Sequence, residues 1–274
     1  MTNLPEVFDH QGAHLRYRDR PGPAAPVVLT HGAGMDHAMF EPQAQALHEA
    51  GHRVVTWDLP AHGASTLAPG SRFDAATALD HFAALLDHLG LDRPILIGHS
   101  LGGNLSQALV RRLPGRARGL IVVDSAWNAG PLTRFERAML RLAAPSLAAI
   151  PAGRLPGVMA KASAVTPEGA AAAEAAFARM PKPVFLDVWR ATVSLVDPDP
   201  GYRTPIPLGL IRGDADRTGN IAAAMPRWAR AEGVDEHVIP AAGHIVTLDN
   251  PEATTRAIAD LIASWPDPEA GQPE

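Results

Sequence analysis

The stretch Gly98-His99-Ser100-Leu101-Gly102 decides the fold of this chain, because it places a serine between two glycines directly after an apolar run at residues 94–97. A helical pattern follows over residues 101–113. A strand, a G-x-S-x-G turn and a helix together lift a serine hydroxyl into the open at the end of a sheet. Such a pentapeptide also occurs by chance in Gly-rich loops, so the flanking strand and helix carry the argument. We therefore predict that Ser100 is a nucleophile.

Length and composition favour one large α/β domain with room for an insertion. The 274 residues include 24 Lys and Arg and 29 Asp and Glu, which gives a formal net charge of −5. Because the two signs are interleaved, we expect a small-molecule substrate and neither nucleic acid nor a membrane as partner. The chain contains no cysteine, which excludes disulfides, thiolate nucleophiles and zinc–thiolate sites. We expect a monomer or a homodimer.

The start of the chain bears on its compartment. Residues 1–6 have neither the basic start nor the apolar core of a secretory signal, and no later apolar run is long enough to span a bilayer. We therefore expect a soluble, cytoplasmic protein, although the lack of cysteine would also be compatible with export.

Strand-like and helix-like segments alternate at both ends of the chain. Eight stretches are predicted as strands: residues 7–8, 14–17, 26–30, 53–57, 94–97, 119–123, 207–211 and 235–239. Helical patterns occur at residues 40–49, 73–89, 101–113, 221–231 and 251–265. Repeated strand–helix–strand units with apolar strands imply a mostly parallel sheet that is covered by helices on both faces.

This alternation stops after Asp124. Residues 126–203 are rich in alanine, and helices are predicted at residues 132–142, 167–180 and 184–196. A single crossover connection rarely needs so many residues. We therefore assign residues 1–125 and 204–274 to the core, and residues 126–203 to a helical insertion over the end of the sheet. A run of ordinary crossover helices is the alternative.

A serine nucleophile needs a base to take its proton and a third group to orient that base. His244 is the best placed of the twelve histidines, because it follows the strand predicted at residues 235–239 and precedes the last helix. A loop at the carboxyl end of a strand is where parallel sheets gather their sites. We predict His244 as the base.

The acid is expected in the stretch Arg212-Gly213-Asp214-Ala215-Asp216, which follows the strand predicted at residues 207–211. Asp214 lies at the turn itself, where an aspartate commonly bonds its own backbone. Asp216 has a freer position and is the favoured acid. Asp124 is a weaker candidate, since a turn or capping role suits it better.

The reaction also needs hydrogen-bond donors for the oxygen on which negative charge develops. The loop His31-Gly32-Ala33-Gly34 follows the strand predicted at residues 26–30, and its small residues leave backbone N–H groups accessible. The N–H groups of Ala33 and Leu101 are the expected pair for this oxyanion hole. The glycines also suit a simple tight turn, and both roles can hold together.

These residues, in the chain order Ser100, Asp216 and His244, resemble the α/β-hydrolase family. The resemblance covers nearly the whole chain and rests on five segments in order: His31-Gly32, residues 58–65 (Asp-Leu-Pro-Ala-His-Gly-Ala-Ser), residues 98–103 (Gly-His-Ser-Leu-Gly-Gly), Gly213-Asp214-Ala215-Asp216 and Gly243-His244. It supports Asp216 as the acid, because the family uses the later carboxylate of such a G-D-x-D stretch. It also implies that the helical insertion is the lid that family members carry after the sixth strand.

The resemblance implies an α/β-hydrolase fold, with a mostly parallel eight-stranded sheet flanked by helices. The residues around Ser100 look most like those of esterases, lipase-like enzymes and lactonases. The implied reaction is cleavage of an ester or lactone through an acyl-enzyme on Ser100, which requires no metal and no organic cofactor. A carbon–carbon bond hydrolase, a cofactor-free perhydrolase and a non-catalytic ligand-binding protein are the alternatives.

Roles can also be assigned to residues outside the catalytic set. Asp58, His62 and Ser65 are expected to be structural and His99 to pack, whereas Met35 and His37 either touch the substrate or lie on the surface. Large apolar residues of the insertion indicate either an apolar cavity or the insertion's own core: Trp127, Phe135, Met139, Met159, Phe177, Phe185 and Trp189. We expect a small to medium, largely apolar acyl substrate.

Overall fold

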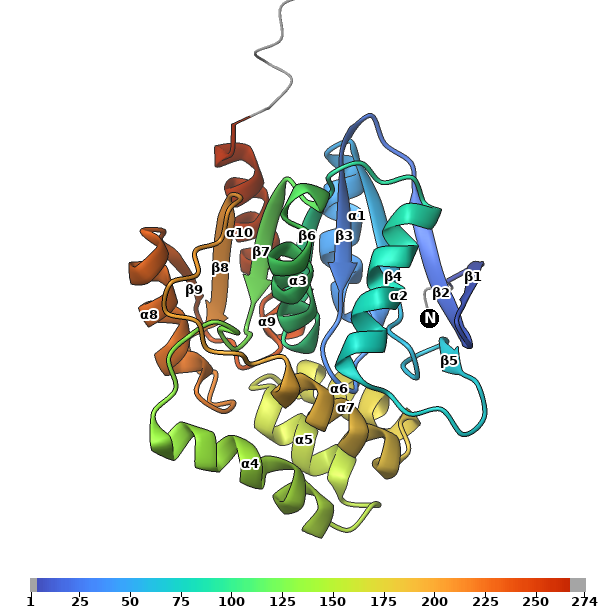
Figure 1. Ribbon diagram of the computed structural model, residues 1–274, viewed down its shortest axis with the longest axis vertical. Coiled ribbons are helices and arrows are strands. Elements are labelled where there is room, and N and C mark those ends of the chain that lie inside the picture. The colour runs from blue at the N-terminus through green and yellow to red at the C-terminus, as the bar shows by residue number, and fades with distance from the viewer. Residues whose placement is uncertain (1–3, 267–274) are drawn as a thin grey trace, which may run out of the picture.

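The predicted sheet is present in the computed structural model of the protein, which describes residues 4–266 (Figure 1). The strands run in the order β1-β2-β4-β3-β6-β7-β8-β9, and the short β5 pairs with β2. They are β1 (Glu6–His10), β2 (Ala13–Arg20), β3 (Ala24–Thr30), β4 (His52–Trp57), β5 (Thr66–Leu67), β6 (Ile95–His99), β7 (Gly119–Val123), β8 (Leu208–Gly213) and β9 (Glu236–Ile239). All antiparallel pairs involve β2, and the other strands pair in parallel. The one strand beyond the eight predicted is β5, whose two residues are too few to show a periodicity.

Helices cover both faces of the sheet, as predicted. One face carries α2 (Ala75–His88), α3 (Leu101–Arg112) and α8 (Ile221–Glu232), and the other carries α1 (Glu41–Glu49) and α10 (Pro251–Ser264). Shorter helical turns are η1 (His37–Phe40), η2 (Pro114–Arg116) and α9 (Val246–Asp249). Alternate residues of a strand point to opposite faces. Val28 of β3 accordingly packs in the core under α2 and α3, whereas Leu29 packs in the core under α1 and α10.

Four helices lie between β7 and β8 and gather at one end of the sheet (Figure 1). They are α4 (Arg134–Ala149), α5 (Leu155–Ser163), α6 (Pro167–Arg179) and α7 (Lys182–Ser194). The sequence predicts three of them and misses α5, whose first residues include Pro156 and Gly157, a pair that usually marks a turn. The helix α4 continues past its predicted end at residue 142. No helix formed by residues 4–266 combines the length and apolarity needed to cross a membrane.

The turn between β6 and α3 holds Ser100 in a backbone conformation that side chains rarely adopt, with φ of 50° and ψ of −115°. Two glycines let this turn close. A Cβ on Gly98 would lie 2.3 Å from the carbonyl oxygen of Gly102, and a Cβ on Gly102 would lie 2.1 Å from that of Thr30. The glycines that flank the serine are therefore required because α3 approaches the backbones of β6 and β3 without any intervening side chain.

We expect Gly102→Ala to lower the free energy of unfolding by about 1–3 kcal/mol or more, because the added methyl group meets backbone that cannot move aside. Gly115→Ala is the matched control, since a Cβ there meets nothing within 4 Å. It should change the free energy by no more than about 0.5 kcal/mol. Urea unfolding of both variants measures the difference, and equal stabilities would contradict this account of the turn.

Candidate active site

Ser100 lies where β6 ends and α3 begins, on the side of the sheet at which the parallel strands end. Two hydrogen bonds hold its backbone against the end of β7 and the residues that follow. The N–H of Ser100 donates to the carbonyl of Val123 at 2.9 Å, and the hydroxyl of Ser125 donates to the carbonyl of Ser100 at 2.7 Å. Ser100 itself is partly exposed, although His99 and Leu101 on either side are buried. The turn thus presents the serine side chain while burying its neighbours.

The structure brings the predicted base and acid together. Nδ1 of His244 lies 3.1 Å from Oδ2 of Asp216, and the residues are 7% and 2% exposed. Burial raises the pKa of the Asp216 carboxyl, but the attraction to His244 and hydrogen bonds from His244 and Thr218 outweigh it and bring the pKa to about 2. Asp216 is therefore ionised at neutral pH and accepts the Nδ1 proton of His244, which leaves Nε2 as the ring nitrogen that can act as the acceptor.

His99 has more than the packing role expected for it. Its Nε2–H donates to the backbone carbonyl of His244 at 2.7 Å, and the two rings lie 4.8 Å apart between centroids. Burial, and then the nearby His244, lower the pKa of His99 to about 3, so the ring is neutral. Because His99 directly precedes Ser100, this bond ties the His244 loop to the serine turn.

The loop after β3 lies against the same turn. The backbone N–H of Leu59 donates to Nε2 of His31 at 2.9 Å, so the proton of this buried ring is on Nδ1, which donates to the carbonyl of Gly32 at 2.8 Å. A trans peptide points its carbonyl and its N–H in opposite directions, so the N–H of Ala33 points away from His31. A Cβ on Gly32 would lie 3.2 Å from that of Ser100.

The two predicted oxyanion-hole donors are available. Among residues 4–266, neither the N–H of Ala33 nor that of Leu101 donates to another group of the protein. Leu101 follows Ser100 directly, and the Ala33 loop is held beside the turn by the contact of Gly32. An oxygen bound next to Ser100 could therefore accept from both groups.

The loop after β4 is structural, as expected. Oδ1 of the buried Asp58 accepts hydrogen bonds at 2.8 Å from both the backbone and the ring of His37, and Oδ2 accepts the N–H of Ala64 at 2.7 Å. Ser65 donates to the carbonyl of Asp58 at 2.7 Å. Met35 is buried rather than on the surface, with 4% exposure. The carboxylate of Asp58 thus joins the loop after β4 to the turn that carries His37.

Asp124 lies closer to the candidate site than its predicted turn or capping role implies. Its Oδ1 accepts the N–H of Gly213 at 2.9 Å, while its buried Oδ2 has no hydrogen-bond partner in the described chain. Burial, and then the negative charge of Asp216, raise the pKa of Asp124 well above its usual value. Carboxylate and imidazole atoms of Asp124, Asp216 and His244 lie within 4.8 Å of one another, a metal-like spacing. The raised pKa of Asp124 disfavours the ionised carboxylate that a cation requires as a ligand.

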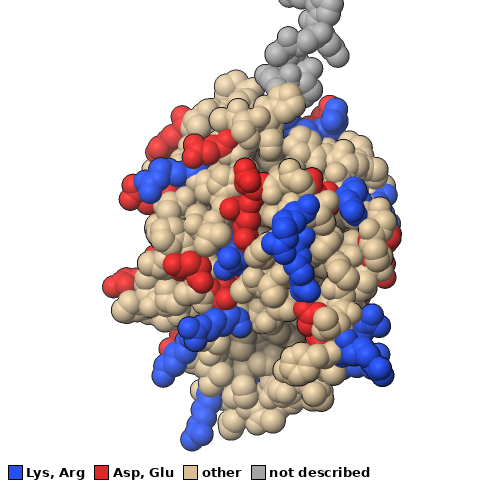
Figure 2. Space-filling view, turned by 90° about the vertical axis from the view of Figure 1, so that its left-hand side faces the viewer, with Lys and Arg blue, Asp and Glu red and all other residues tan. Residues whose placement is uncertain are grey.

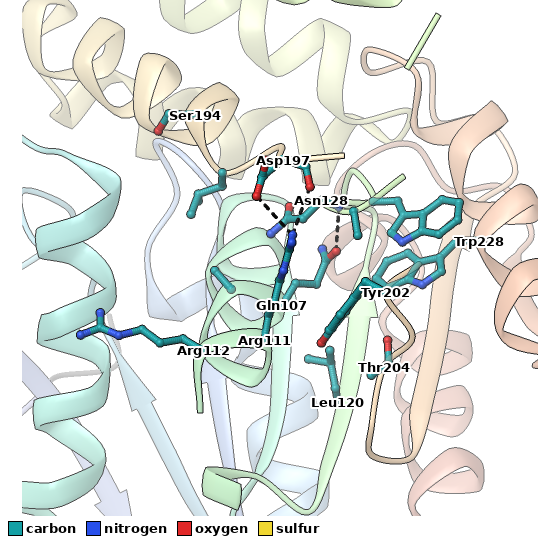
Figure 3. Close-up of a pocket in the computed structure, with 14 residues that line it drawn as sticks. Gln107, Arg111, Arg112, Leu120, Asn128, Ser194, Asp197, Tyr202, Thr204 and Trp228 are labelled. Atoms are coloured by element: carbon teal, nitrogen blue, oxygen red, sulfur yellow. Dashed lines mark hydrogen bonds and ion pairs between the residues drawn. The ribbon is translucent and has the colours of Figure 1, made fainter. Parts of the chain in front are cut away.

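One cavity of the protein lies away from the candidate site and is not lined by Ser100. It has a volume of about 250 Å³ and lies between α3, α8 and the ends of the insertion (Figure 3). Several of its polar groups already have partners: Arg111 bonds Asp199 and the carbonyl of Asp197, and the indole of Trp228 donates to Glu232. Cavity volume alone therefore does not identify the functional site of this protein.

The insertion touches the site through its inner helices. A Cβ on Gly34 would lie 2.5 Å from the ring of Phe177 and 3.1 Å from that of Phe185, so α6 and α7 pack on the Ala33 loop. The N–H of Ile245 donates to the carbonyl of Ser163 at 3.0 Å. The side chains of Phe135 and Met139 are instead 73% and 51% exposed, so they neither line a cavity nor fill the insertion's core, contrary to both expectations.

The structure combines a mostly parallel sheet with a serine on a strained turn that follows one strand. A histidine and an aspartate that follow two later strands are hydrogen-bonded to each other. Together these features define the class of α/β hydrolases. The sequence model of the alpha/beta hydrolase family matches residues 27–257. The chain belongs to this family.

Individual relatives match in part. A putative carbamate hydrolase RutD of Variovorax paradoxus is 34% identical over 108 residues, which are 39% of this chain and 40% of the relative. A 2-hydroxy-6-oxo-2,4-heptadienoate hydrolase of Pseudomonas putida is 32% identical over 114 residues, 41% of each chain. The matched segment thus spans well under half the length of these curated relatives.

Solved structures match over almost the whole chain. A thermophilic esterase from Thermogutta terrifontis is 26% identical with a TM-score of 0.75, over 92% of this chain and 93% of that one. The enol-lactonase from Burkholderia xenovorans has a TM-score of 0.80 at 22% identity, over 94% of this chain and 100% of its own. At that identity the second likeness concerns the fold alone.

Asp124 makes a pH-dependent contribution to stability whose sign can be worked out. Because its folded pKa is raised, the favourable contribution of the protonated carboxyl is complete below the unfolded pKa near 3.8 and is lost as pH rises through the folded value. Asp124→Asn cannot ionise and escapes this loss. The unfolding free energy of Asp124→Asn should therefore increase relative to that of the wild type as pH rises above 3.8, by up to about 1.4 kcal/mol per pH unit.

Urea unfolding over a pH series measures this gain, with the exposed Asp92→Asn as the control. Stability curves of Asp124→Asn and wild type that stay parallel over the whole series would show that Asp124 is ionised in the folded protein.

Proposed function

We propose that this protein is a serine hydrolase that cleaves a carboxylic ester or lactone of a small to medium, largely apolar substrate through an acyl-enzyme on Ser100. In this proposal Ser100 is the nucleophile, His244 the base and Asp216 the acid that orients it. The observation that carries the proposal is the 3.1 Å hydrogen bond between His244 and Asp216, held beside the serine turn by the bond from His99 to the His244 carbonyl.

The proposed reaction proceeds in two halves. The Ser100 hydroxyl attacks the carbonyl carbon while Nε2 of His244 takes its proton, and Asp216 stabilises the imidazolium that results. The N–H groups of Ala33 and Leu101 bind the oxyanion of the tetrahedral intermediate. His244 then returns the proton to the leaving alkoxide, which leaves the acyl group on Ser100. Water attacks this ester in the same way, and the carboxylic acid is released.

Residues 126–203 form the lid in this proposal, with residues 1–125 and 204–274 as the core. The proposal is supported by the packing of Phe177 and Phe185 against Gly34 and by the bond from Ile245 to Ser163, which link the insertion to both loops beside Ser100. An apolar wall of this kind favours an apolar acyl group. The esterase from Thermogutta terrifontis, at 26% identity, supports an ester as the substrate.

Cleavage of a carbon–carbon bond is the second candidate, because a curated relative is a 2-hydroxy-6-oxo-2,4-heptadienoate hydrolase at 32% identity. The same serine, histidine and aspartate would serve that reaction. A panel of esters, lactones and diketones separates the two candidates, since the proposal expects the highest kcat/KM on an ester or a lactone.

Replacing the nucleophile tests the proposal most directly. Ser100→Ala should lower kcat on a short-chain nitrophenyl ester by at least about 10³-fold, because no other group can form the acyl-enzyme. A serine-directed phosphonate should label the wild type at Ser100. Equal rates for wild type and variant, together with an unlabelled Ser100, would favour a ligand-binding protein without turnover.

The acid is tested by a matched pair of substitutions in one loop. Asp216→Asn should lower kcat by about 10³-fold or more, since an amide donates to Nδ1 and holds the wrong histidine tautomer. Asp214 is exposed and, among residues 4–266, accepts only the N–H of Ala242 at 3.2 Å, a bond that an amide oxygen also accepts. Asp214→Asn should therefore stay within about threefold of the wild type, and the reverse order would reassign the acid.

A further inference from the structure

The helix α4 presents an unusual apolar surface to solvent. Phe135, Met139 and Leu142 are 73%, 51% and 55% exposed, and their spacing of four and three residues places them on one face of the helix. Ala144 is the one residue of α4 that is buried. Other large exposed apolar side chains of the described chain, such as Val7 and Val238, are scattered over separate elements. We call Phe135, Met139 and Leu142 the α4 stripe.

A row of arginines runs along another sector of the same helix. At 100° per residue, Arg134, Arg137 and Arg141 fall within one sector, which is separate from the stripe and borders the buried Ala144 at Arg137. All three are exposed and form no ion pair within residues 4–266, and Arg137 donates only to the carbonyl of Leu132. Many arginines elsewhere pair with carboxylates, as Arg53 does with Asp19. The α4 row therefore keeps its positive charge available to a partner.

The net charge of the whole chain does not reflect this local excess of positive charge. Residues 126–203 contain nine Lys and Arg against six Asp and Glu, whereas the chain as a whole has a net charge of −5. In Figure 2 the lower end of the molecule, where α4 lies, shows mainly tan surface bordered by blue side chains, with few red ones. The expectation of no membrane partner rests on the averaged charge, and the local distribution differs from that average.

We propose that α4 is an interfacial helix that docks this protein on the surface of an anionic lipid bilayer. The α4 stripe enters the boundary between headgroups and acyl chains, and the long arginine side chains reach the phosphates. Such a contact is peripheral and needs no membrane-spanning helix. It is also independent of the chemistry proposed for Ser100.

A second copy of the chain fits this surface less well. In a symmetric dimer, two antiparallel α4 helices would face each other across a two-fold axis. Both arginine rows would then lie on the same side of the helix pair, where like charges repel. An anionic lipid surface instead satisfies the stripe and the arginine row at once. The charge on the helix therefore favours lipid as the occupant.

Co-sedimentation with phospholipid vesicles tests the proposal, and using Ser100→Ala protein keeps the result independent of catalysis. The protein should bind vesicles that contain phosphatidylglycerol at least about tenfold more tightly than pure phosphatidylcholine, and high salt should weaken this binding. Phe135→Ser with Met139→Ser, and separately Arg134→Gln with Arg141→Gln, should each weaken binding by at least about tenfold.

Matched controls make the result specific to α4. Val7→Ser with Val238→Ser removes exposed apolar groups elsewhere, and Arg217→Gln with Arg230→Gln removes exposed charges elsewhere; both pairs should bind as the parent does. Thermal unfolding confirms that each variant is folded. Absence of vesicle binding, or binding that the α4 variants leave unchanged, would overturn the proposal. So would a dimer that Phe135→Ser with Met139→Ser dissociates, because the stripe would then belong to a second copy.

Discussion

The close approach of three backbones around Ser100 is the constraint on which the rest of the site depends. Gly98 and Gly102 leave no side chain between β6, α3 and β3, and the turn can then hold Ser100 at a φ of 50°. That conformation costs free energy, which the packing of α3 against the sheet must offset. The strained turn is thus a consequence of how helix and sheet meet. It exposes one hydroxyl in a region where the surrounding residues are buried.

Neutral buried histidines then fix the groups around this turn. His31 directs the peptide between Gly32 and Ala33, and His99 holds the carbonyl of His244. Burial lowers the pKa of both, so each ring keeps one donor and one acceptor and orients its partner without adding a charge. His244 differs because it pairs with the ionised Asp216. The negative charge of Asp216 therefore lies where a positive charge would develop on the imidazole.

Much of this arrangement could be predicted from the sequence because the relevant side chains stand next to strongly patterned elements. Ser100, Asp216 and His244 each follow an apolar strand, and the ends of parallel strands meet at one edge of a sheet. The bond between His99 and the His244 carbonyl joins residues 145 apart, and a main-chain acceptor leaves no trace in residue type. The same holds for Asp124, whose effect arises from burial beside Asp216. The fold and the candidate side chains could thus be predicted from the sequence, whereas the hydrogen bonds that orient them could not.

The insertion shows why residue type alone is a weak guide to the role of apolar side chains. Phe177 and Phe185 pack on the loop of Gly34, whereas Phe135 and Met139 of the same insertion point into solvent. All four are large and apolar, and all lie in segments with a helical pattern, so the sequence assigns them together. Their fates differ because α6 and α7 are held against the core, while α4 contacts the protein along one side only. Burial in this insertion is therefore set by which helix lies next to the sheet, and an apolar side chain on its outermost helix is available for a partner.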